Sequence, residues 1–549
     1  MISKSFSERP LGEYDACVVG SGPAGIVFAL EAARLGRRVL VLESGGVEPD
    51  ERQQALSDAD IIDPSRHDDM SIAVSRRLGG TSNLWAARCQ PFDPIDFEAR
   101  PGLRENLWPI PYSDIRPYYP AALDYLAAGT DVFHAPIAGV ETGSETFDYT
   151  RLERFSNVPA IQKRHAEELE QSQNIDLRLG STVVEIDLAD GIVRNVVVAD
   201  VDGKRHTVPV KTLVLACGGL ECTRQLLVLQ KRHPELFGGA DGPLGRHYMG
   251  HLIGEVADVT FSSEAADAAY DFFVDDNGSY VRRRIVPSDA SQRANDLLNI
   301  CFWPIVPPVA DARHRSGILS TVCLVFAIAP LGRLLVAEAI RKRHIPEKLR
   351  WLPHLVNILR DMPGTLSFVP RFLHKRYLAK MRMPGFFLRN AGRQYGLSYH
   401  AEQTPLSQSR VTLSGAVDRF GMPKLSIDYR FSRADAEAVL RAHQLLASWL
   451  EENNIGTVAY RQPEAETVDA ILALAGHGTH QIGLTRMAET QRDGVVDSNL
   501  RCFGTDNLHV ASAAVFPTSG QCNPTLSIAA FSVRLARHLF AAPASSAKS

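Results

Sequence analysis

The sequence lacks several features that would assign it to a specialised class of proteins. Its eight cysteines are scattered over 549 residues with no C-x-x-C pair. This pattern argues against a disulfide scaffold or a structural zinc site and favours reduced thiols in a cytosol. There is no excess of basic residues, since the formal net charge is −4, and this argues against a dedicated nucleic-acid binder.

Long apolar runs are also missing. The longest apolar stretch, residues 318–331, is interrupted by Ser320, Thr321 and Pro330. It is shorter than the ~18 apolar residues that suggest a spanning helix. The opening MISKSFSERPLGEY has no apolar core of signal-peptide length. We therefore predict a cytoplasmic protein. Its hydrophobic content of 45% and charged content of 22% are ordinary for globular proteins, and its length suggests more than one domain.

The first forty residues contain a dinucleotide-binding fingerprint. In YDACVVGSGPAGIVFALEAARLGRRVLVLESGG, the residues Ala16–Val19 predict a strand, Gly20, Gly22 and Gly25 form G-x-G-x-x-G, and a helix begins near Pro23. A second strand at Val39–Leu42 ends at Glu43. Gly20 permits the tight turn, Gly22 lets the backbone approach a pyrophosphate, and Gly25 allows close helix–strand packing. The helix N-terminus would bind the phosphates and Glu43 the ribose hydroxyls. The fingerprint alone does not separate FAD from NAD.

Two further patterns predict the rest of the architecture. VKTLVLACGGLECTRQLLV (210–228) predicts a strand, a small-residue turn at Ala216 and Gly218, and a helix. Before it, short strands with turns at Asp190-Gly191 and Asp202-Gly203 predict an inserted β-meander. The region from about 255 to 475 contains alternating strands, as in RVTLSGAVDRFGMPKLSIDYRF, and a helical pattern at Arg433–Leu450. We interpret it as a mixed substrate domain.

With these segments in place, the chain resembles the glucose–methanol–choline (GMC) oxidoreductases, a family of FAD-dependent alcohol and sugar oxidoreductases. Four segments carry the resemblance: the glycine fingerprint, LGGTSNLWAARCQPFDPIDFEAR with WPIPYSDIRPYY, EQTPLSQSRVTLSGAVDRFGMP, and the stretch from HQIGLTRM to VRLARHL. The last is the most specific, because H-x-x-G-x-x-R-M, V-V-D, N-L-x-V, F-P-T and N-P-T-L follow in the family's order. The segment LGGTSNLWAARCQPFDPIDFEAR resembles the family's flavin-covering loop, and WPIPYSDIRPYY resembles the helix entry beyond it.

The resemblance implies an α/β fold class: a discontinuous Rossmann-type FAD-binding domain with a mixed antiparallel-sheet and helix substrate domain. We expect the FAD-binding domain to comprise residues 12–100, 160–255 and 475–545. The substrate domain would comprise 101–159 and 256–474, with a basic helical insert at about 318–395.

The resemblance also assigns the chemistry. His480 stands where the family places the base that takes the hydroxyl proton while hydride leaves the carbinol carbon for flavin N5. An unperturbed imidazole titrates near ~6.5 and suits this role. Asn523, opening N-P-T-L, stands where the family places the second group facing the hydroxyl, and its amide can orient the substrate. Pro524 suits the first turn of a helix whose N-terminus would face the flavin pyrimidine edge.

The expected cofactor contacts combine the fingerprint and the resemblance. They are Gly20, Gly22, Pro23, Ala24, Gly25, Glu43, Ser44, Gly80, Thr81, Asn83, Leu84, Trp85, Val183, Val184, Ala216, Gly218, Ala513, Asn523, Pro524 and Thr525.

Three positions depart from the family pattern. Covalent members carry histidine in S-T-H-W, whereas this chain has Leu84 in Ser82-Asn83-Leu84-Trp85. Leucine has no atom to bond the flavin, so we predict non-covalent FAD. Ser512 replaces a common aspartate, which predicts a weaker or different contact there. Leu484 separates the glycine and threonine that follow the histidine.

Other candidate groups are weaker. His477 is a rival base, but it would leave the glycine and Arg486-Met487 out of register. Arg486 itself is interpreted as a structural or phosphate-facing cation. His247 and His251 in GRHYMGHL have metal-like spacing but no third ligand beside them, which favours packing in the core or an interface. No metal site is predicted.

A basic segment lies inside the predicted substrate domain. Residues 341–393 contain 13 Lys and Arg against two acids, with aromatic and leucine residues interleaved, Phe386 among them. Such a segment fits a membrane surface. We favour a solvated insert that covers the substrate site or forms an oligomer contact, because five prolines interrupt any long helix.

The leading functional hypothesis is FAD-dependent oxidation of an alcohol, sugar or glycoside to a carbonyl, with oxygen, a quinone or a carrier protein as electron acceptor. A lyase or decarboxylase on the same flavoprotein fold is the alternative. A third is a nicotinamide-dependent reductase or nucleotide-binding module that uses only the N-terminal unit.

Overall fold

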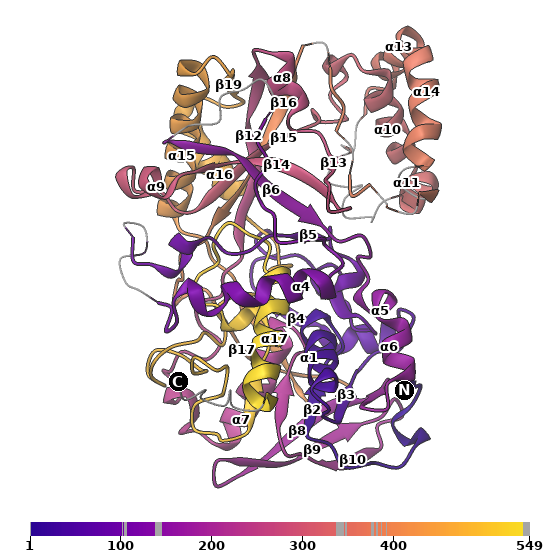
Figure 1. Ribbon diagram of the computed structural model, residues 1–549, viewed down its shortest axis with the longest axis vertical. Coiled ribbons are helices and arrows are strands. Elements are labelled where there is room, and N and C mark those ends of the chain that lie inside the picture. The colour runs from indigo at the N-terminus through magenta and orange to yellow at the C-terminus, as the bar shows by residue number, and fades with distance from the viewer. Residues whose placement is uncertain are drawn as a thin grey trace, which may run out of the picture.

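The computed structural model describes residues 2–100, 103, 107–137, 145–335, 345, 349–374, 378, 379, 381, 383–385, 387–390 and 392–541. Part of the predicted basic segment, including Phe386, lies outside these residues. The sheets are stacked along the long axis of the molecule, with a helical lobe beside the upper one (Figure 1).

The lower part is built on a six-stranded parallel sheet with the order β1-β7-β3-β2-β11-β20. Its strands are β1 (Ile2–Ser3), β2 (Ala16–Val19), β3 (Val39–Leu42), β7 (Ile175–Arg178), β11 (Leu213–Leu215) and β20 (Leu508–Val510). The strands β2, β3 and β11 are buried along their whole length, which explains their unbroken apolar sequences. The predicted strands Ala16–Val19 and Val39–Leu42 are confirmed.

Three long helices pack around this sheet. They are α1 (Pro23–Arg34), α7 (Gly219–Arg232) and α17 (Thr525–Phe540), and α1 and α17 lie against each other. Shorter helices join them: α2 (Glu51–Gln54), α3 (Met70–Ala73), α4 (Tyr119–Tyr125), α5 (Ile161–Arg164) and α6 (Ala166–Gln171). The predicted meander is confirmed as an antiparallel sheet of β8 (Thr182–Ala189), β9 (Ile192–Ala199) and β10 (Arg205–Pro209).

The upper part is an eight-stranded antiparallel sheet. Its strands are β5 (Arg88–Cys89), β6 (Phe147–Phe155), β12 (His251–Phe261), β13 (Phe273–Val274), β14 (Tyr280–Pro287), β15 (Ile300–Ile305), β16 (Gln394–Glu402) and β19 (Gly456–Tyr460). The helices α8 (Glu264–Ala268), α9 (Asp289–Ala294), α15 (Arg433–Glu452) and α16 (Glu464–Leu474) accompany it. The predicted helix at Arg433–Leu450 is confirmed as α15. The strands β12 and β16 pair along most of their length, and this brings two distant parts of the chain together.

A small third sheet joins the predicted domains. The hairpin of β17 (Arg410–Val417) and β18 (Pro423–Asp428) is antiparallel, and β18 pairs in parallel with β4 (Ala59–Ile61). Residues 410–428, placed in the substrate domain by sequence, thus share a sheet with residues placed in the FAD-binding domain. The predicted α/β class with parallel and antiparallel layers is confirmed, and each of the two large sheets has its own apolar core.

Candidate active site

A cavity of about 440 Å³ opens at the carboxyl ends of the parallel strands. Residues Gly20–Ala24 line it after β2, Glu43 and Ser44 after β3, and Ala216 after β11. Ligands of open α/β sheets bind at this edge, because strand ends and helix N-termini converge there. His480, Asn523, Pro524 and Thr525 line the same cavity.

The glycine turn has the geometry that a dinucleotide requires. Gly20 has φ +101°, and a Cβ there would lie 2.7 Å from the Ala216 carbonyl oxygen. A Cβ on Gly25 would lie 2.0 Å from the Gly20 oxygen, so α1 packs closely against the turn. At Gly22 a Cβ would meet nothing within 4 Å, because that position borders the cavity. The open space therefore lies at the N-terminus of α1, which has no side-chain cap.

Glu43 is buried and fastens this loop. Its Oε2 accepts hydrogen bonds from the Ser21 amide (2.9 Å) and hydroxyl (2.6 Å), and its Oε1 accepts one from the Gly45 amide (2.8 Å). The same carboxylate lines the cavity. Glu43, which we expected to contact a ribose, thus also orders the glycine turn. Its position in the sequence did not indicate this second role.

Most of the expected cofactor contacts line the cavity, and three do not. The lining members are Gly20, Gly22, Pro23, Ala24, Glu43, Ser44, Gly80, Thr81, Leu84, Trp85, Val183, Ala216, Gly218, Ala513, Asn523, Pro524 and Thr525. Gly25 lies behind the turn. The Asn83 amide donates to the carbonyl oxygens of Leu78 and Gly80 and so braces the loop that contains it. Val184 is buried against Ala199 and Met422.

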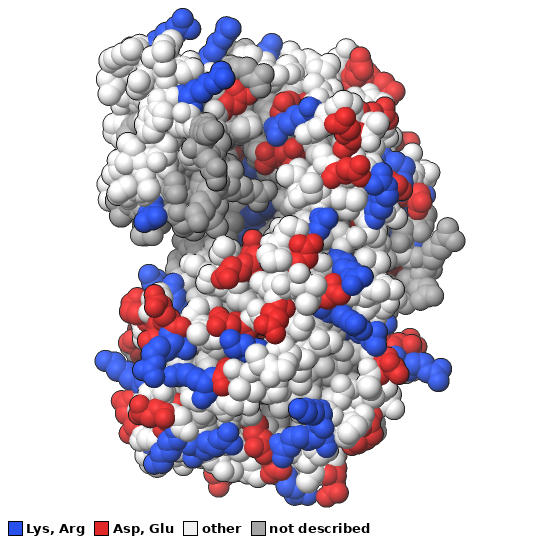
Figure 2. Space-filling view, turned by 180° about the vertical axis from the view of Figure 1, so that it is seen from behind, with Lys and Arg blue, Asp and Glu red and all other residues white. Residues whose placement is uncertain are grey.

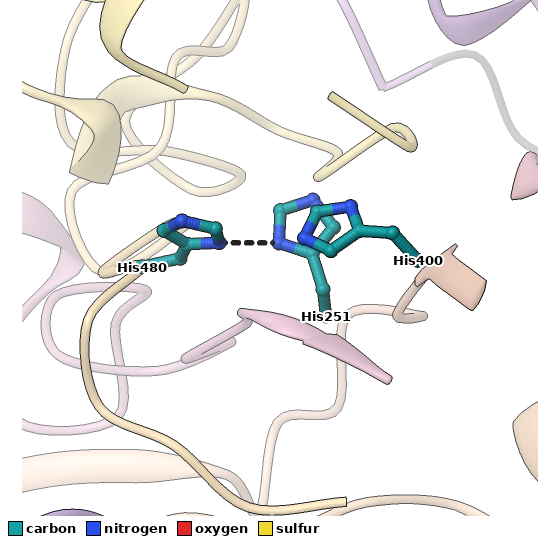
Figure 3. A group of neighbouring side chains, drawn as sticks. All are labelled: His251, His400 and His480. Carbon is teal, nitrogen blue, oxygen red and sulfur yellow. Dashed lines mark hydrogen bonds between the residues drawn. The ribbon is translucent and has the colours of Figure 1, made fainter. Parts of the chain in front are cut away.

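His480 stands in a hydrogen-bonded chain of three side chains. Its Nδ1 lies 2.8 Å from Nδ1 of His251, and its Nε2 lies 3.2 Å from the amide nitrogen of Asn523 (Figure 3 for the histidines). An amide nitrogen can only donate, so Nε2 is the acceptor and the neutral ring carries its proton on Nδ1. This proton is donated to His251. The lone pair of His480 is thereby held at Nε2.

A third histidine, His400, completes the cluster. It comes from β16, stacks on His251 with ring centroids 4.0 Å apart, and lies 5.6 Å from the His480 ring centroid. Its Nδ1 donates to the Gln521 carbonyl oxygen (2.6 Å), which leaves Nε2 as an acceptor. Within the described part of the chain, Nε2 of His400 and Oδ1 of Asn523 are buried without a hydrogen-bond partner. Both residues line the cavity.

Burial keeps these rings neutral. It holds the pKa of His480 well below the ordinary histidine value, and the nearby His251 and His477 act in the same direction. Burial likewise lowers the pKa of His251 and of His400. A neutral imidazole can accept a proton, so His480 is in the form that a base requires.

The three histidines are also the residues to consider for a metal. Their ligand atoms lie within 4.8 Å of one another. Two nitrogens on a tetrahedral zinc with bonds of ~2.0–2.1 Å would stand about 3.3 Å apart. The 2.8 Å between the Nδ1 atoms of His251 and His480 is instead a hydrogen-bond distance. The geometry therefore favours a proton-transfer cluster.

The other candidate groups have structural partners. His477 donates to the His251 carbonyl oxygen (3.0 Å) and is not part of the cavity lining. The Arg486 guanidinium donates to the Asp493 carbonyl oxygen (2.6 Å) and is also outside the lining. His251 is buried, in agreement with the packing role expected from the sequence. Its hydrogen bond to His480 and the presence of His400 in the cluster were not predicted.

The sequence contained only a partial signal for the missed residues. His400 stands two positions before EQTPL, the segment that carried part of the resemblance, whereas nothing near His251 indicated its partner. Further lining residues were also missed, among them Arg76 and Glu221, which form a salt bridge of 2.8 Å, and Arg88, which pairs with Glu153.

Comparison with known proteins agrees with this geometry. Residues 405–532 match the family described as GMC oxidoreductase, and this span includes His480 and Asn523. Over this span the chain is similar to that family. It follows that the resemblance noted in the sequence holds for the region that supplies the candidate base.

Two relatives extend the likeness. The chain is 31% identical over 146 residues to a C-glycoside 3-oxidase of Arthrobacter globiformis, covering 26% of each protein. It is 23% identical over 316 residues to a 2-methyl-1,2-propanediol dehydrogenase of Mycolicibacterium austroafricanum, covering 45% of this chain and 57% of the relative. These matches thus span 26% and 57% of the relatives' own lengths.

Solved structures share the fold over nearly the whole chain. Pyridoxine 4-oxidase from Mesorbium loti superposes with a TM-score of 0.55 at 17% identity, covering 96% of this chain and 99% of the other. A fungal aryl-alcohol oxidase gives a TM-score of 0.51 at 13% identity, covering 97% and 99%. At these identities the likeness concerns the fold alone.

Proposed function

We propose that the protein is an FAD-dependent oxidoreductase that converts a CH–OH group to a carbonyl, with His480 as the general base. One observation carries the proposal: a single cavity is lined by the glycine turn with Glu43 and by the His480–Asn523 pair. The residues expected to bind the cofactor and the residues expected to transfer the proton thus line the same cavity.

The residues present fit FAD. Gly22 leaves open space at the N-terminus of α1, where a pyrophosphate would bind, and Glu43 lines the cavity beside it. Gly80, Thr81, Leu84 and Trp85 would cover the flavin. Because Leu84 occupies the position of the linking histidine, we propose that FAD is held without a covalent bond. When bound, FAD would supply the acceptor for the hydride that leaves the carbinol carbon.

The chain itself supplies the proton acceptor. In the cavity, a substrate hydroxyl would replace the Asn523 amide as the donor to Nε2 of His480. His480 takes the hydroxyl proton at Nε2, and the resulting imidazolium still donates from Nδ1 to His251. Asn523 turns its amide to the substrate oxygen and orients it. His251 is a positioning residue, because it holds the ring and selects its tautomer without lining the cavity.

Three acceptor atoms of cavity-lining residues favour substrates with more than one hydroxyl. Nε2 of His480, Nε2 of His400 and Oδ1 of Asn523 are acceptors, and the last two have no partner among the described residues. Unsatisfied buried acceptors are costly, so a ligand that donates hydrogen bonds is favoured there. We therefore propose a diol, sugar or glycoside, which agrees with a C-glycoside 3-oxidase and a propanediol dehydrogenase among the relatives.

The proposal extends to the organisation of the chain. Residues 12–100, 160–255 and 475–545 would form the FAD-binding domain and residues 101–159 and 256–474 the substrate domain. Electrons would pass from the flavin to oxygen, a quinone or a carrier protein.

Anaerobic reduction with a panel of sugars, glycosides, diols and simple alcohols tests the function. We expect purified yellow protein to bleach, with polyhydroxy compounds reacting faster. Because the base must be neutral and its pKa is lowered, the rate should be level through pH 7–8 and fall only below the ordinary histidine value of ~6.5. Turnover without bleaching would support a lyase instead, and a colourless protein that binds NAD would contradict the proposal.

Substitution of His251 tests its positioning role. His251→Leu removes the acceptor for the Nδ1 proton of His480, and we expect kcat to fall about 10- to 100-fold with KM little changed. In His251→Asn, the amide oxygen can accept the same proton and should restore most of the rate. Stopped-flow reduction and the flavin spectrum measure both variants. Equal losses in the leucine and asparagine variants would show that His251 acts only in packing.

A further inference from the structure

A lobe of short helices stands beside the antiparallel sheet (upper right in Figure 1). It contains α10 (Gly317–Ala327), α11 (Ala329–Leu335), α13 (Trp351–Arg360) and α14 (Met362–Leu373). Both α13 and α14 pack on α10. Among the described residues, no helix is both long and apolar enough to cross a membrane.

The buried side of α13 is polar. His354 and Asn357 of α13 are buried against α10, where the His354 ring and the Asn357 amide each lie 3.1 Å from the Ser320 hydroxyl. The Asn357 amide also donates to the Ala312 carbonyl oxygen (2.9 Å). A helix on a soluble protein normally buries its apolar face and exposes its polar one. In α13 this arrangement is reversed.

The outer side carries the leucines. Leu352 is 72% exposed, Leu359 66% and Leu366 67%. Other large apolar side chains of the lobe are exposed as well: Ile328, Leu331, Trp351, Leu355, Met362, Leu373 and Leu378. Single exposed leucines are ordinary, but several large apolar side chains exposed on two neighbouring helices indicate an interaction surface. We call the exposed side chains of α13 and α14 the leucine face.

Positive charge borders the leucine face. Arg350, Arg360 and Arg371 are exposed there. Asp361, the acid described in this stretch, is turned inward and accepts a hydrogen bond from the Gly317 amide (3.3 Å). In Figure 2 the same lobe, at upper left, is largely white with blue side chains at its margin. Residues 341–393 as a whole contain 13 Lys and Arg against two acids.

We propose that the leucine face docks on the surface of an anionic lipid membrane. Its leucines would enter the boundary between headgroups and acyl chains, and its arginines would pair with lipid phosphates. A twofold contact with a second copy is less favourable, because such an interface places the same patch against itself and would bring its arginines together. The sequence alone favoured a solvated insert over a membrane-surface segment. The reversed polarity of α13 now favours the membrane surface, because its apolar side chains face outward.

Vesicle flotation tests the proposal independently of the redox function. Wild-type protein is mixed with phosphatidylcholine vesicles containing half phosphatidylglycerol, and with pure phosphatidylcholine vesicles. We expect flotation with the first and little with the second. The triple variant Leu352→Gln, Leu359→Gln, Leu366→Gln should lose partitioning by at least about tenfold. The triple variant Arg350→Gln, Arg360→Gln, Arg371→Gln should lose the preference for the anionic lipid.

A matched control distinguishes binding through the leucine face from binding through any exposed apolar side chains. Val47, Ile62 and Val417 are exposed to a similar degree elsewhere on the molecule. The variant Val47→Gln, Ile62→Gln, Val417→Gln should float like the wild type, and unchanged circular dichroism and flavin absorbance show that each variant is folded. Absence of wild-type flotation, or equal flotation of the leucine variant and this control, would overturn the proposal. So would a wild-type dimer that the leucine substitutions convert to monomer, because a second copy would then cover the face.

Discussion

Replacing His480 by alanine is expected to slow anaerobic reduction of the bound flavin by roughly 10²–10⁴-fold, the usual worth of general-base catalysis. The substitution removes the Nε2 acceptor and breaks the contacts with Asn523 and His251. The protein should remain yellow, because the glycine turn and Glu43 are untouched. Stopped-flow absorbance with a substrate identified in the panel measures the effect.

His477 provides the control for this experiment. It lies beside His480, with ring centroids 5.3 Å apart, but it is not part of the cavity lining. His477→Gln keeps a donor for the His251 carbonyl oxygen and should change the rate less than about threefold. If His480→Ala reduced at the wild-type rate while His477→Gln was slow, the base would have been assigned to the wrong histidine.

Filling the open space at Gly22 is expected to abolish tight FAD binding. A Cβ there meets nothing within 4 Å, so Gly22→Val should fold without a clash while its side chain occupies the place of the pyrophosphate. We expect the dissociation constant for FAD to rise on the order of 100-fold and the purified protein to be colourless. Flavin fluorescence titration measures the affinity, and circular dichroism confirms the fold.

The control is a glycine with similar free space away from the cavity. A Cβ on Gly415, in β17, also meets nothing within 4 Å, so Gly415→Val should bind FAD as the wild type does. Normal flavin content in Gly22→Val would show that the cofactor does not approach the α1 N-terminus as proposed.

Much of the part built on the parallel sheet could be predicted because its signals are local. The strand Ala16–Val19, the turn with Gly20, Gly22 and Gly25, and the strand Val39–Leu42 follow one another within thirty residues, and each has a single physical task. Buried parallel strands have continuous apolar sequences, so their limits were accurate to the residue. Asn83 and Val184, expected at the cofactor from the resemblance, do not line the cavity: Asn83 braces its own loop, and Val184 packs against Ala199 and Met422.

The partners of His480 could not be predicted in the same way. His251 begins β12 and His400 lies in β16, strands separated by more than a hundred residues, and only their antiparallel pairing brings both to His480. Side chains alternate in direction along a strand, so a shift of one residue in that register would point either ring away. The same applies to Leu352 and Leu359, whose exposure depends on which face of α13 packs on α10.

The sequence by itself determined the glycine turn, the strands beside it and the position of the candidate base, because each depends on neighbouring residues and backbone preferences. Only the tertiary structure decided which groups position that base and which side of α13 faces outward. It also decided which buried acceptor atoms of the cavity-lining residues lack a hydrogen-bond partner among the described residues. These depend on strand register and helix packing, and both result from contacts between residues far apart in the chain.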